Sequence, residues 1–325
     1  MTTTQQQAIG SGFGAHSTAQ QVVADVDLTG KLAVVTGGYA GLGLATTRAL
    51  VGAGARVVVP ARRPEVARAA TEGIEGVEID ALDLADLDGV RDFADRFLAT
   101  GRTIDLVFNN AGIMACPLTR VGPGWEAQFA TNHLGHYALV NRLWPAIADG
   151  GARVVSVSSR GHQLSGMRWQ DVHFGDDAEY DKWLAYGQAK TANVLFAVEL
   201  DRRGRGSGVR AYAAHPGVIL TELARHIPVA EQRAAGWIDA EGRPTDPNKK
   251  TPEQGAATQV WAATSARLAD AGGVYCEDCD IAQPWAGDTP LTSGVAAHAT
   301  DVEQAARLWD LSAELTGVNA LAAAG

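Results

Sequence analysis

A tyrosine and a lysine stand four residues apart in "AYGQAKTANVLF", residues 185–196, a stretch that is otherwise mostly small and apolar. Residues i and i+4 share one helix face, about 5–6 Å apart at Cβ, so the side chains of Tyr186 and Lys190 can meet. A free phenol has a pKa of about 10, and a lysine charge about 4 Å away could lower that pKa by roughly two units. The pair could therefore transfer a proton near neutral pH, although a single pair of this kind more often only packs a helix.

Three glycines follow the first apolar run of the chain in "TGGYAGLG", residues 36–43. Gly37, Gly41 and Gly43 fall between an expected strand and an expected helix. There, backbone N–H groups and the positive end of the helix can hold a pyrophosphate. The spacing is Gly-x-x-x-Gly-x-Gly, which differs from the commonest dinucleotide fingerprint. A plain glycine-rich turn would look similar, but the position in the first strand–helix unit favours a nucleotide site.

The elements that must position these residues alternate along the chain. Seven short apolar runs lack a polar alternation, which is expected of strands covered on both faces. Segments of helical length lie between them, at 41–53, 86–100, 125–148 and 183–203. This rhythm predicts an α/β fold, a doubly wound and mostly parallel seven-stranded sheet with helices on both faces. The predicted strands are 32–36, 55–60, 76–80, 104–109, 152–158, 209–214 and 272–276.

Three segments lie outside this rhythm. Residues 1–27 are polar and are predicted to form an N-terminal arm, with residues 28–325 as a single domain. Residues 160–182 and 223–250 are long insertions after the fifth and sixth strands. Long irregular segments in compact domains are usually functional loops or disordered, so we interpret these two as substrate loops. Thr251, Pro252 and Gln254 carry the pattern of a helix start, with a capping box and an early proline.

Composition excludes several classes of partner. The net charge of −10 disfavours a nucleic-acid partner or an anionic membrane surface. No run approaches the ~18 apolar residues of a membrane span. Three cysteines are too few for a disulfide framework, so we expect a reducing, cytoplasmic location. Cys276 and Cys279 have the Cys-x-x-Cys form, but one other cysteine and no metal spacing among the histidines make a structural role more probable than a metal site.

At this point the ordered motifs identify a family. The sequence resembles the short-chain dehydrogenase/reductases, which carry Thr-Gly-x-x-x-Gly-x-Gly, Asn-Asn-Ala-Gly, an Asn, a Ser and a Tyr-x-x-x-Lys. Here these are "TGGYAGLG", "NNAG" at 109–112, Asn132, the serines of "VVSVSSRGH", and Tyr186 with Lys190. The resemblance covers about residues 28–316, and "NHLGH", "HPGVILTEL" and "LWDLSAEL" are most similar to the retinol-dehydrogenase and WW-domain-oxidoreductase branch. It implies a Rossmann fold that binds NAD(P).

The resemblance also implies a role for each motif residue. Tyr186 would be the proton donor or acceptor, and Lys190 would support it and hold the nicotinamide ribose. Ser159, the second serine of its pair, would bind the substrate oxygen, whereas Ser158 would be a satisfied hydroxyl at the strand end. Asn132 would hold a water that relays protons to the lysine.

The end of the second strand predicts the cofactor to be NADP(H) rather than NAD(H). A dehydrogenase that selects NAD(H) places an acid there to bind the ribose 2′-hydroxyl, but this position is Ala61. Arg62 follows it, and a guanidinium matches phosphate geometry. Asp83 would hold the adenine amino group. The resemblance assigns cofactor contacts to Thr36, Gly37, Tyr39, Gly41, Leu42, Gly43, Arg62, Asp83, Leu84, Asn110, Ala111, Gly112, Tyr186, Lys190, Pro216, Gly217, Val218 and Thr221.

The sequence therefore predicts an oxidoreductase that transfers hydride between NADP(H) and a small carbonyl compound or secondary alcohol. Trp169, Trp183, Ile227 and Trp237 suggest an apolar substrate wall, although each could be ordinary core. The resemblance favours a homodimer or homotetramer. Two alternatives stay open, namely a reductase of C=C bonds and a non-catalytic NADP-binding interaction protein.

Overall fold

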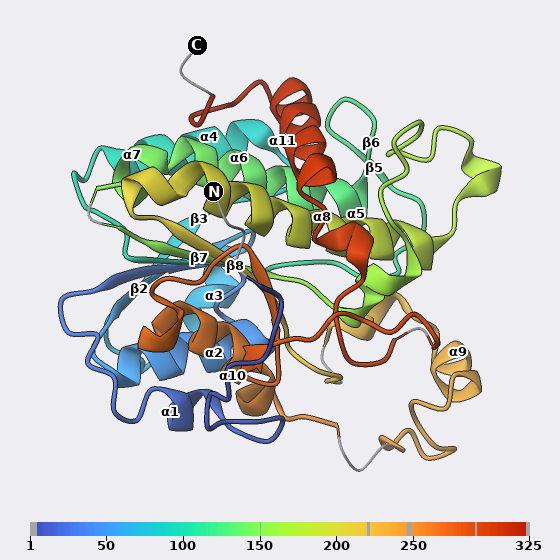
Figure 1. The fold of residues 1–325 in the computed structure, drawn as a ribbon, viewed down its shortest axis with the longest axis horizontal. Helices are drawn as coiled ribbons and strands as arrows, with labels where there is room; N and C mark the ends of the chain where they lie inside the picture. Colours follow the sequence, from blue (N-terminus) through green and yellow to red (C-terminus); the bar gives the residue numbers. More distant parts are fainter. Residues whose placement is uncertain (1–4, 150, 220–221, 246–248, 290, 323–325) are drawn as a thin grey trace.

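The computed structural model describes residues 5–322 except 150, 220–221, 246–248 and 290. The structure is built around one central sheet (Figure 1). This sheet has eight strands in the order β10-β9-β8-β7-β4-β1-β2-β3. Neighbouring strands pair in parallel except β9 and β10, which are antiparallel. The strands are β1 (Leu32–Val35), β2 (Arg56–Ala61), β3 (Val77–Ala81), β4 (Leu106–Asn109), β7 (Arg153–Val157), β8 (Arg210–His215), β9 (Val274–Glu277) and β10 (Asp280–Ile281), and a separate ribbon pairs β5 (Arg120–Val121) with β6 (Trp125–Glu126).

The seven predicted strands are confirmed, but the predicted count of seven is wrong because β10 adds an eighth. This strand has only two residues and turns back directly onto β9, so it lacks an apolar run of its own. The sheet is therefore mostly parallel with one short antiparallel edge strand.

Helices cover both faces of the sheet, as predicted (Figure 1). One core cluster joins the sheet to α4, α6 and α8, and a second joins the opposite face to α1, α2 and α10. The α-helices are α1 (Ala19–Val22), α2 (Gly41–Gly52), α3 (Pro64–Ala70), α4 (Leu87–Leu98), α5 (Ala127–Phe129), α6 (Gly135–Arg142), α7 (Trp144–Ile147), α8 (Lys182–Gly204), α9 (Val229–Ala234), α10 (Pro252–Thr264) and α11 (Val302–Thr316).

Local sequence explains where the two long helices of the site begin. The Asp181 carboxylate accepts hydrogen bonds from the N–H groups of Trp183 and Leu184 at 2.7 and 2.9 Å, which starts α8. The capping box predicted from Thr251 and Gln254 is present at the start of α10.

The single helix predicted over 125–148 is wrong in detail. The region holds β6, α5, a π-helical turn (Ala130–Leu134), α6 and α7. Pro145 lies in the first turn of α7, where its missing N–H costs little. The π-turn contains Asn132, and such turns are often found at functional sites.

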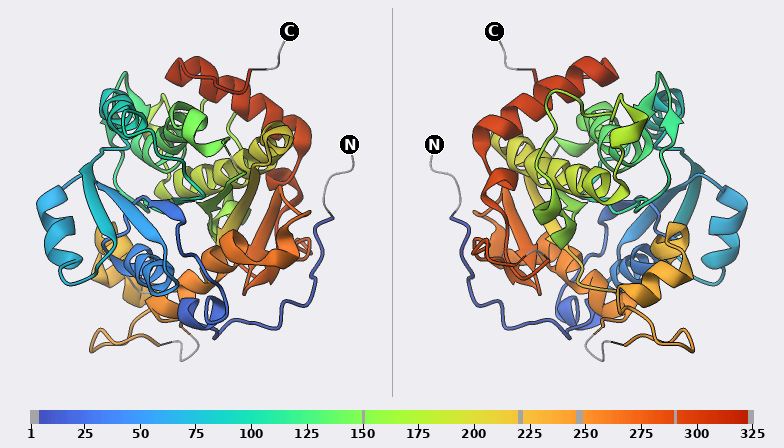
Figure 2. Two further views of the ribbon diagram at one scale, coloured as in Figure 1. Left: turned by 90° about the vertical axis from the view of Figure 1, so that its left-hand side faces the viewer. Right: turned by 90° about the vertical axis from the view of Figure 1, so that its right-hand side faces the viewer.

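The described part of the N-terminal segment, residues 5–27, lies against the β10 end of the sheet and against α10 (Figure 2). The Gln6 side chain donates to the carbonyls of Tyr275 and Ala282 at 2.6 and 2.7 Å. The Asp280 carboxylate accepts from the N–H groups of Ile9 and Gly10, both at 2.9 Å. The segment thus covers an edge of the sheet with polar contacts.

Candidate active site

The predicted motifs meet at the carboxyl ends of four adjacent parallel strands. In the order β8-β7-β4-β1, the strands lead into the segments 216–218, 158–159, 109–112 and 36–43. Ligands of open α/β sheets bind in the crevice outside these strand ends. The sheet topology therefore brings together motifs that are up to about 180 residues apart in sequence.

The glycine-rich turn has the close backbone approach that a pyrophosphate site needs. Gly37 has a φ of +66°, and a Cβ on Gly43 would lie 2.1 Å from the carbonyl oxygen of Gly37. Ala40 precedes α2 and provides no side-chain cap, and the first turn of α2 contains no acidic residue. The N–H groups at the start of this helix are therefore suited to an anionic ligand.

Thr36 joins this turn to the "NNAG" segment. Its hydroxyl accepts from the N–H groups of Asn110 and Ala111, each at 2.9 Å, and the Asn110 amide donates to the Thr36 carbonyl at 2.9 Å. Two loops from different strands thus form one rigid wall. Three other residues predicted to contact the cofactor lie in or against the core. Tyr39 is half-buried against the core cluster that includes α2, and the Leu42 carbonyl accepts a hydrogen bond from Thr46. Leu84 is buried, and its carbonyl oxygen lies close to Gly135.

The corner predicted to select the cofactor contains no acid at the strand end. Ala61 is buried in register with Ala81 of β3, and Arg62 follows as an exposed residue. Asp83 is half-buried, and its carboxylate accepts from the N–H of Ala85 at 3.0 Å. The strand end therefore carries no acid of its own, and the basic residue Arg62 directly follows it.

Tyr186, Lys190 and Ser159 are brought together by α8 and the end of β7. Tyr186 and Lys190 are 5% and 4% exposed, and the Lys190 Nζ lies over the Tyr186 ring, 5.6 Å from its centroid. The Lys190 Nζ donates to the Val157 carbonyl at 2.9 Å. The Ser159 hydroxyl lies beside the phenol and also accepts from the N–H of Gly161 at 3.0 Å.

Burial controls the charges of this pair. It raises the pKa of Tyr186 to about 12, against a smaller lowering by the hydrogen bond with Ser159. Burial also lowers the pKa of Lys190 to about 8. The predicted lowering of the phenol pKa by lysine is therefore wrong, because the Lys190 ammonium bonds the Val157 carbonyl and both charged forms are poorly solvated.

Asn132 uses its side chain to hold the "NNAG" segment. Its amide oxygen accepts from the N–H of Ile113 and its amide nitrogen donates to the Ile113 carbonyl, both at 2.9 Å. A Cβ on Gly112 would lie 3.1 Å from the Asn132 Oδ1 and 3.7 Å from the Lys190 Nζ. The glycine thus permits the close approach of all three residues.

His136, which the sequence predicted only as a polar packing or pocket-lining group, contacts two of the predicted site residues. Its Nδ1 lies 3.0 Å from the Asn132 carbonyl oxygen and its Nε2 lies 2.9 Å from the Thr36 hydroxyl. Burial lowers its pKa to about 4, so the ring is neutral at pH 7 and can donate through one nitrogen and accept through the other. Its position four residues after Asn132 in "NHLGH" was the available signal.

The segment after β8 lies at the same edge of the sheet. Pro216 is half-buried, Gly217 has a φ of +91°, and Val218 is 52% exposed. The Val218 carbonyl accepts from the N–H of Lys250 at 3.0 Å. Thr221, also predicted to contact the cofactor, lies outside the described residues.

Aromatic rings connect Tyr186 to the loop that contains α9. The Trp183 ring makes edge contacts with Tyr186 and with Trp237, at centroid distances of 6.5 and 5.8 Å. Glu231 of α9 accepts from the Lys182 Nζ at 2.5 Å and from the Trp183 Nε1 at 3.3 Å. The loop is thus fixed to the first turn of α8, next to the phenol.

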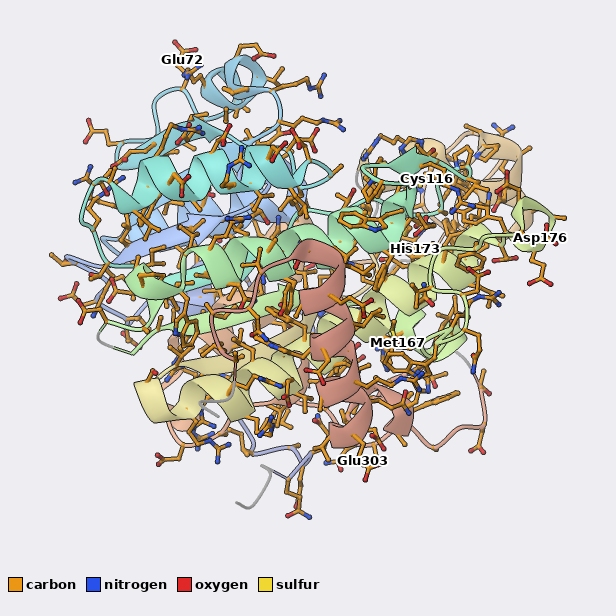
Figure 3. All side chains as sticks on the ribbon, turned by 90° about the horizontal axis from the view of Figure 1, so that it is seen from above. Glu72, Cys116, Met167, His173, Asp176 and Glu303 are labelled. Carbon is orange, nitrogen blue, oxygen red and sulfur yellow. The ribbon has the colours of Figure 1, made fainter. Side chains whose placement is uncertain are left out.

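Trp169 and Ile227, which were also predicted to form an apolar substrate wall, make other contacts. Trp169 lies under the Arg307 guanidinium of α11, 4.2 Å from the ring centroid, and packs against the core cluster that contains Leu308 of the same helix. Ile227 is buried beside its loop. Within the insertion 160–182, Asp176 lies at the opposite side of the molecule from Glu72, which follows α3 (Figure 3).

The cysteines form no metal centre within the described residues. Cys116, Cys276 and Cys279 are buried free thiols, and no group of three or more potential ligands is found in that part of the chain. Burial raises the pKa of the Cys279 thiol to about 11, which makes it unreactive at neutral pH.

Comparison with known proteins decides the family. The sequence profile of the short chain dehydrogenase family matches residues 31–171. A probable oxidoreductase of Streptomyces antibioticus is 46% identical over 92% of this chain and 100% of its own length. A short-chain dehydrogenase/reductase of Penicillium rubens is 35% identical, covering 93% of this chain and 90% of its own. This chain belongs to the short-chain dehydrogenase/reductase family. Retinol dehydrogenase 12 of Mus musculus is also 35% identical, over 90% of this chain and 89% of the mouse protein, which agrees with the predicted branch.

Solved structures share the dehydrogenase fold. An uncharacterized protein from Mycobacterium paratuberculosis is 35% identical with a TM-score of 0.71, covering 94% of this chain and 98% of that one. The Pseudomonas aeruginosa RhlG/NADP complex is 25% identical with a TM-score of 0.59, covering 77% and 95%. In the described part of this chain, no helix combines the length and apolar character needed to cross a bilayer.

Proposed function

We propose that this dehydrogenase uses NADP(H) to interconvert a carbonyl compound and a secondary alcohol. The observation that carries the proposal is the placement of the Tyr186 hydroxyl beside Ser159, with the Lys190 ammonium over the Tyr186 ring, at the carboxyl ends of β7 and β4. The nicotinamide, when bound, supplies or accepts the hydride. The remaining chemistry is the handling of one proton and of the charge on the substrate oxygen.

Tyr186 gives its proton to the substrate oxygen during reduction. Because burial raises its pKa to about 12, the phenol is protonated at neutral pH, which suits a proton donor. Ser159 donates a hydrogen bond to the same oxygen and stabilises the negative charge that develops there. Lys190, with a pKa of about 8, is mostly protonated at pH 7, and its ammonium lies over the phenol ring, 5.6 Å from the ring centroid.

The cofactor preference rests on the corner between β2 and α3. Arg62 provides a cation for a 2′-phosphate, and the strand end at Ala61 provides no acid for a free 2′-hydroxyl. The NADP complex of RhlG, a neighbour in fold, gives independent support. Thr36, Asn110 and the glycine turn would hold the rest of the dinucleotide.

An apolar substrate fits the surroundings of Tyr186. Trp183 and Trp237 continue the aromatic surface outward from its ring. Relatives named retinol dehydrogenases are consistent with this substrate class.

The test is a panel of apolar aldehydes, ketones and enones with NADPH, followed by its absorbance and by product identification. Tyr186→Phe keeps the ring volume and should lower carbonyl reduction by about 10²- to 10⁴-fold while NADPH binding persists. Wild-type turnover in the Phe variant would refute the role of Tyr186. Saturation of an enone C=C bond with ketones untouched would instead favour the C=C reductase.

A further inference from the structure

The turn between β9 and β10 carries three carboxylates, and each contacts a different part of the protein. Its sequence is "CEDCD", residues 276–280. Asp278 and Cys279 at its tip have φ values of +52° and +61°, in the left-handed region that favours glycine. Two consecutive non-glycine residues in this conformation are uncommon, and such backbone is retained where its surroundings require it.

Glu277 holds the turn that presents Ser159. Its side chain is 3% exposed, and its Oε1 accepts from the Arg160 Nε at 2.8 Å. Its Oε2 accepts from the N–H of Gly294 at 2.9 Å and from the Ser293 hydroxyl at 3.2 Å. Arg160 directly follows Ser159 in the sequence. Because all of these contacts converge on one buried carboxylate, the backbone after Ser159 is fixed from outside its own loop.

Asp278 holds the segment that follows β8. Its carboxylate pairs with the Lys250 Nζ at 2.5 Å, and the lysine side chain is only 7% exposed. The lysine stem crosses Gly217 so closely that a Cβ there would lie 2.6 Å from the Lys250 Cδ. The Lys250 N–H also donates to the Val218 carbonyl at 3.0 Å. Lys250 therefore clamps the 216–218 segment, and Asp278 fixes Lys250.

The two ion pairs meet around the end of β8. His215 is the register partner of Glu277 on the neighbouring strand, and its ring is buried. Its pKa is lowered well below the ordinary value, first by burial and then by the charges of Arg160 and Lys250. Two cations thus approach one neutral ring, and the carboxylates of Glu277 and Asp278 balance them. Exposed ion pairs contribute little to stability, but Glu277 and Lys250 are both buried.

We propose that Glu277 and Asp278 are positioning residues, Glu277 for the Ser159 hydroxyl on the substrate side and Asp278 for the 216–218 segment on the cofactor side. This inference rests on the proposed function, in which Ser159 binds the substrate oxygen, and on the cofactor contacts predicted for Pro216, Gly217 and Val218. Neither carboxylate touches a reacting atom. Each acts through one cation, Arg160 or Lys250, on one half of the site.

Because Glu277 and Asp278 act on different parts of the site, their conservative variants should change different parameters. Asp278→Asn frees the Lys250 clamp and should raise the dissociation constant of NADPH roughly 10-fold, measured by fluorescence titration without substrate. Glu277→Gln loosens the Ser159 turn and should lower kcat roughly 10- to 100-fold, with NADPH affinity within about twofold of wild type.

Asp280→Asn is the matched control, because its carboxylate lies at the same turn but, among the described residues, accepts hydrogen bonds from the N-terminal segment and its own strand. It should leave both kcat and NADPH affinity unchanged. A turn with a purely structural role would shift the same parameters in all three variants. If Glu277→Gln does not fold, as judged by circular dichroism, Arg160→Gln breaks the same contact from its more exposed side and should show the same loss of kcat.

Combining substitutions of Asp278 and Lys250 in one protein gives a second measurement. Lys250→Met should weaken NADPH binding as Asp278→Asn does, and the double variant should be no weaker than either single variant. Normal NADPH affinity in Asp278→Asn, normal kcat in Glu277→Gln, or altered kinetics in Asp280→Asn would overturn the inference while the proposed function stands. A wild-type protein that binds neither NADPH nor NADH would instead refute the proposed function, and the inference with it.

Discussion

Burial of the Lys190 charge should make the protein less stable than it would be with an apolar residue at this position. Its side chain is 4% exposed, and burial lowers its pKa from the ordinary 10.5 to about 8. Each pKa unit corresponds to about 1.4 kcal/mol, so the protonated lysine costs the folded state about 3 kcal/mol. Lys190→Met retains an apolar stem of similar length and removes this cost.

The destabilisation by the Lys190 charge must decrease as the pH rises. Below about pH 8 the lysine is protonated in both the folded and the unfolded chain, and the full cost applies. Between about pH 8 and pH 10.5 the unfolded chain holds the proton and the folded chain does not, so the stability of the wild type rises with pH. The Met variant lacks this rise. The free-energy difference between the two proteins should therefore change by about 3 kcal/mol across the window.

The variant also loses one hydrogen bond, but this loss does not depend on pH in the same way. The Val157 carbonyl accepts from the Lys190 Nζ and also from the Asn193 Nδ2, each at 2.9 Å. It therefore keeps a donor, and the lost bond costs about 1 kcal/mol. At pH 7 we expect Lys190→Met to be about 2 kcal/mol more stable than the wild type, the difference between these two magnitudes.

Urea unfolding followed by circular dichroism at about pH 7 and about pH 10 measures this difference. Lys31→Met, at an exposed position, controls for the general loss of one positive charge. A difference between wild type and Lys190→Met that stays constant across the window would refute the reasoning, whatever its size. Loss of activity in the more stable variant would show that the lysine is kept for function.

Three further changes test separate parts of the site. Ser159→Ala should lower turnover roughly 10²-fold, whereas Ser158→Ala, whose hydroxyl is already bonded to a helix carbonyl, should leave steady-state kinetics near wild type; the reverse order would show that the hydroxyls were misassigned. Arg62→Ala should weaken NADPH roughly 10- to 150-fold and NADH little in fluorescence titrations, and tighter NADH than NADPH in the wild type would contradict the assignment. Gly43→Ala places a Cβ 2.1 Å from the Gly37 carbonyl oxygen, so dinucleotide affinity should fall at least about 10-fold while the circular dichroism spectrum is retained. Normal dinucleotide affinity in this variant would mean that the turn can shift freely.

The strands were predictable because burial on both faces leaves a clear signal in the sequence. A run such as "LAVVT" has no polar alternation, and β1 (Leu32–Val35) is buried throughout. The eighth strand had no such signal, because β10 has two residues and its pairing with β9 is decided by the turn between them. Periodicity likewise predicted helix over 125–148 but did not reveal the π-turn that contains Asn132.

The site was predictable as a set of positions, but the electrostatics were not. The spacing of Tyr186 and Lys190 on one helix face placed the ammonium near the ring, as observed. Spacing does not reveal that the ammonium donates to Val157 or that both groups are almost fully buried. The sign of the phenol pKa shift depends on these two facts, and the prediction failed for that reason.

Contacts between segments that are distant in the sequence were the part of the site that the sequence predicted least. Glu277 and Arg160 are 117 residues apart, and nothing in either local sequence indicates the other. In "CEDC" the paired cysteines attract attention, because their spacing matches a metal or redox motif. The structure buries both thiols, and the two acids between them pair with two different cations, Arg160 and Lys250. A spacing motif states which residues are neighbours along the chain, whereas an ion pair depends on which strand ends the sheet brings together. For this turn, the order β9-β8-β7 places Glu277 within reach of Arg160 after β7, and Asp278 within reach of Lys250, whose stem crosses Gly217 after β8.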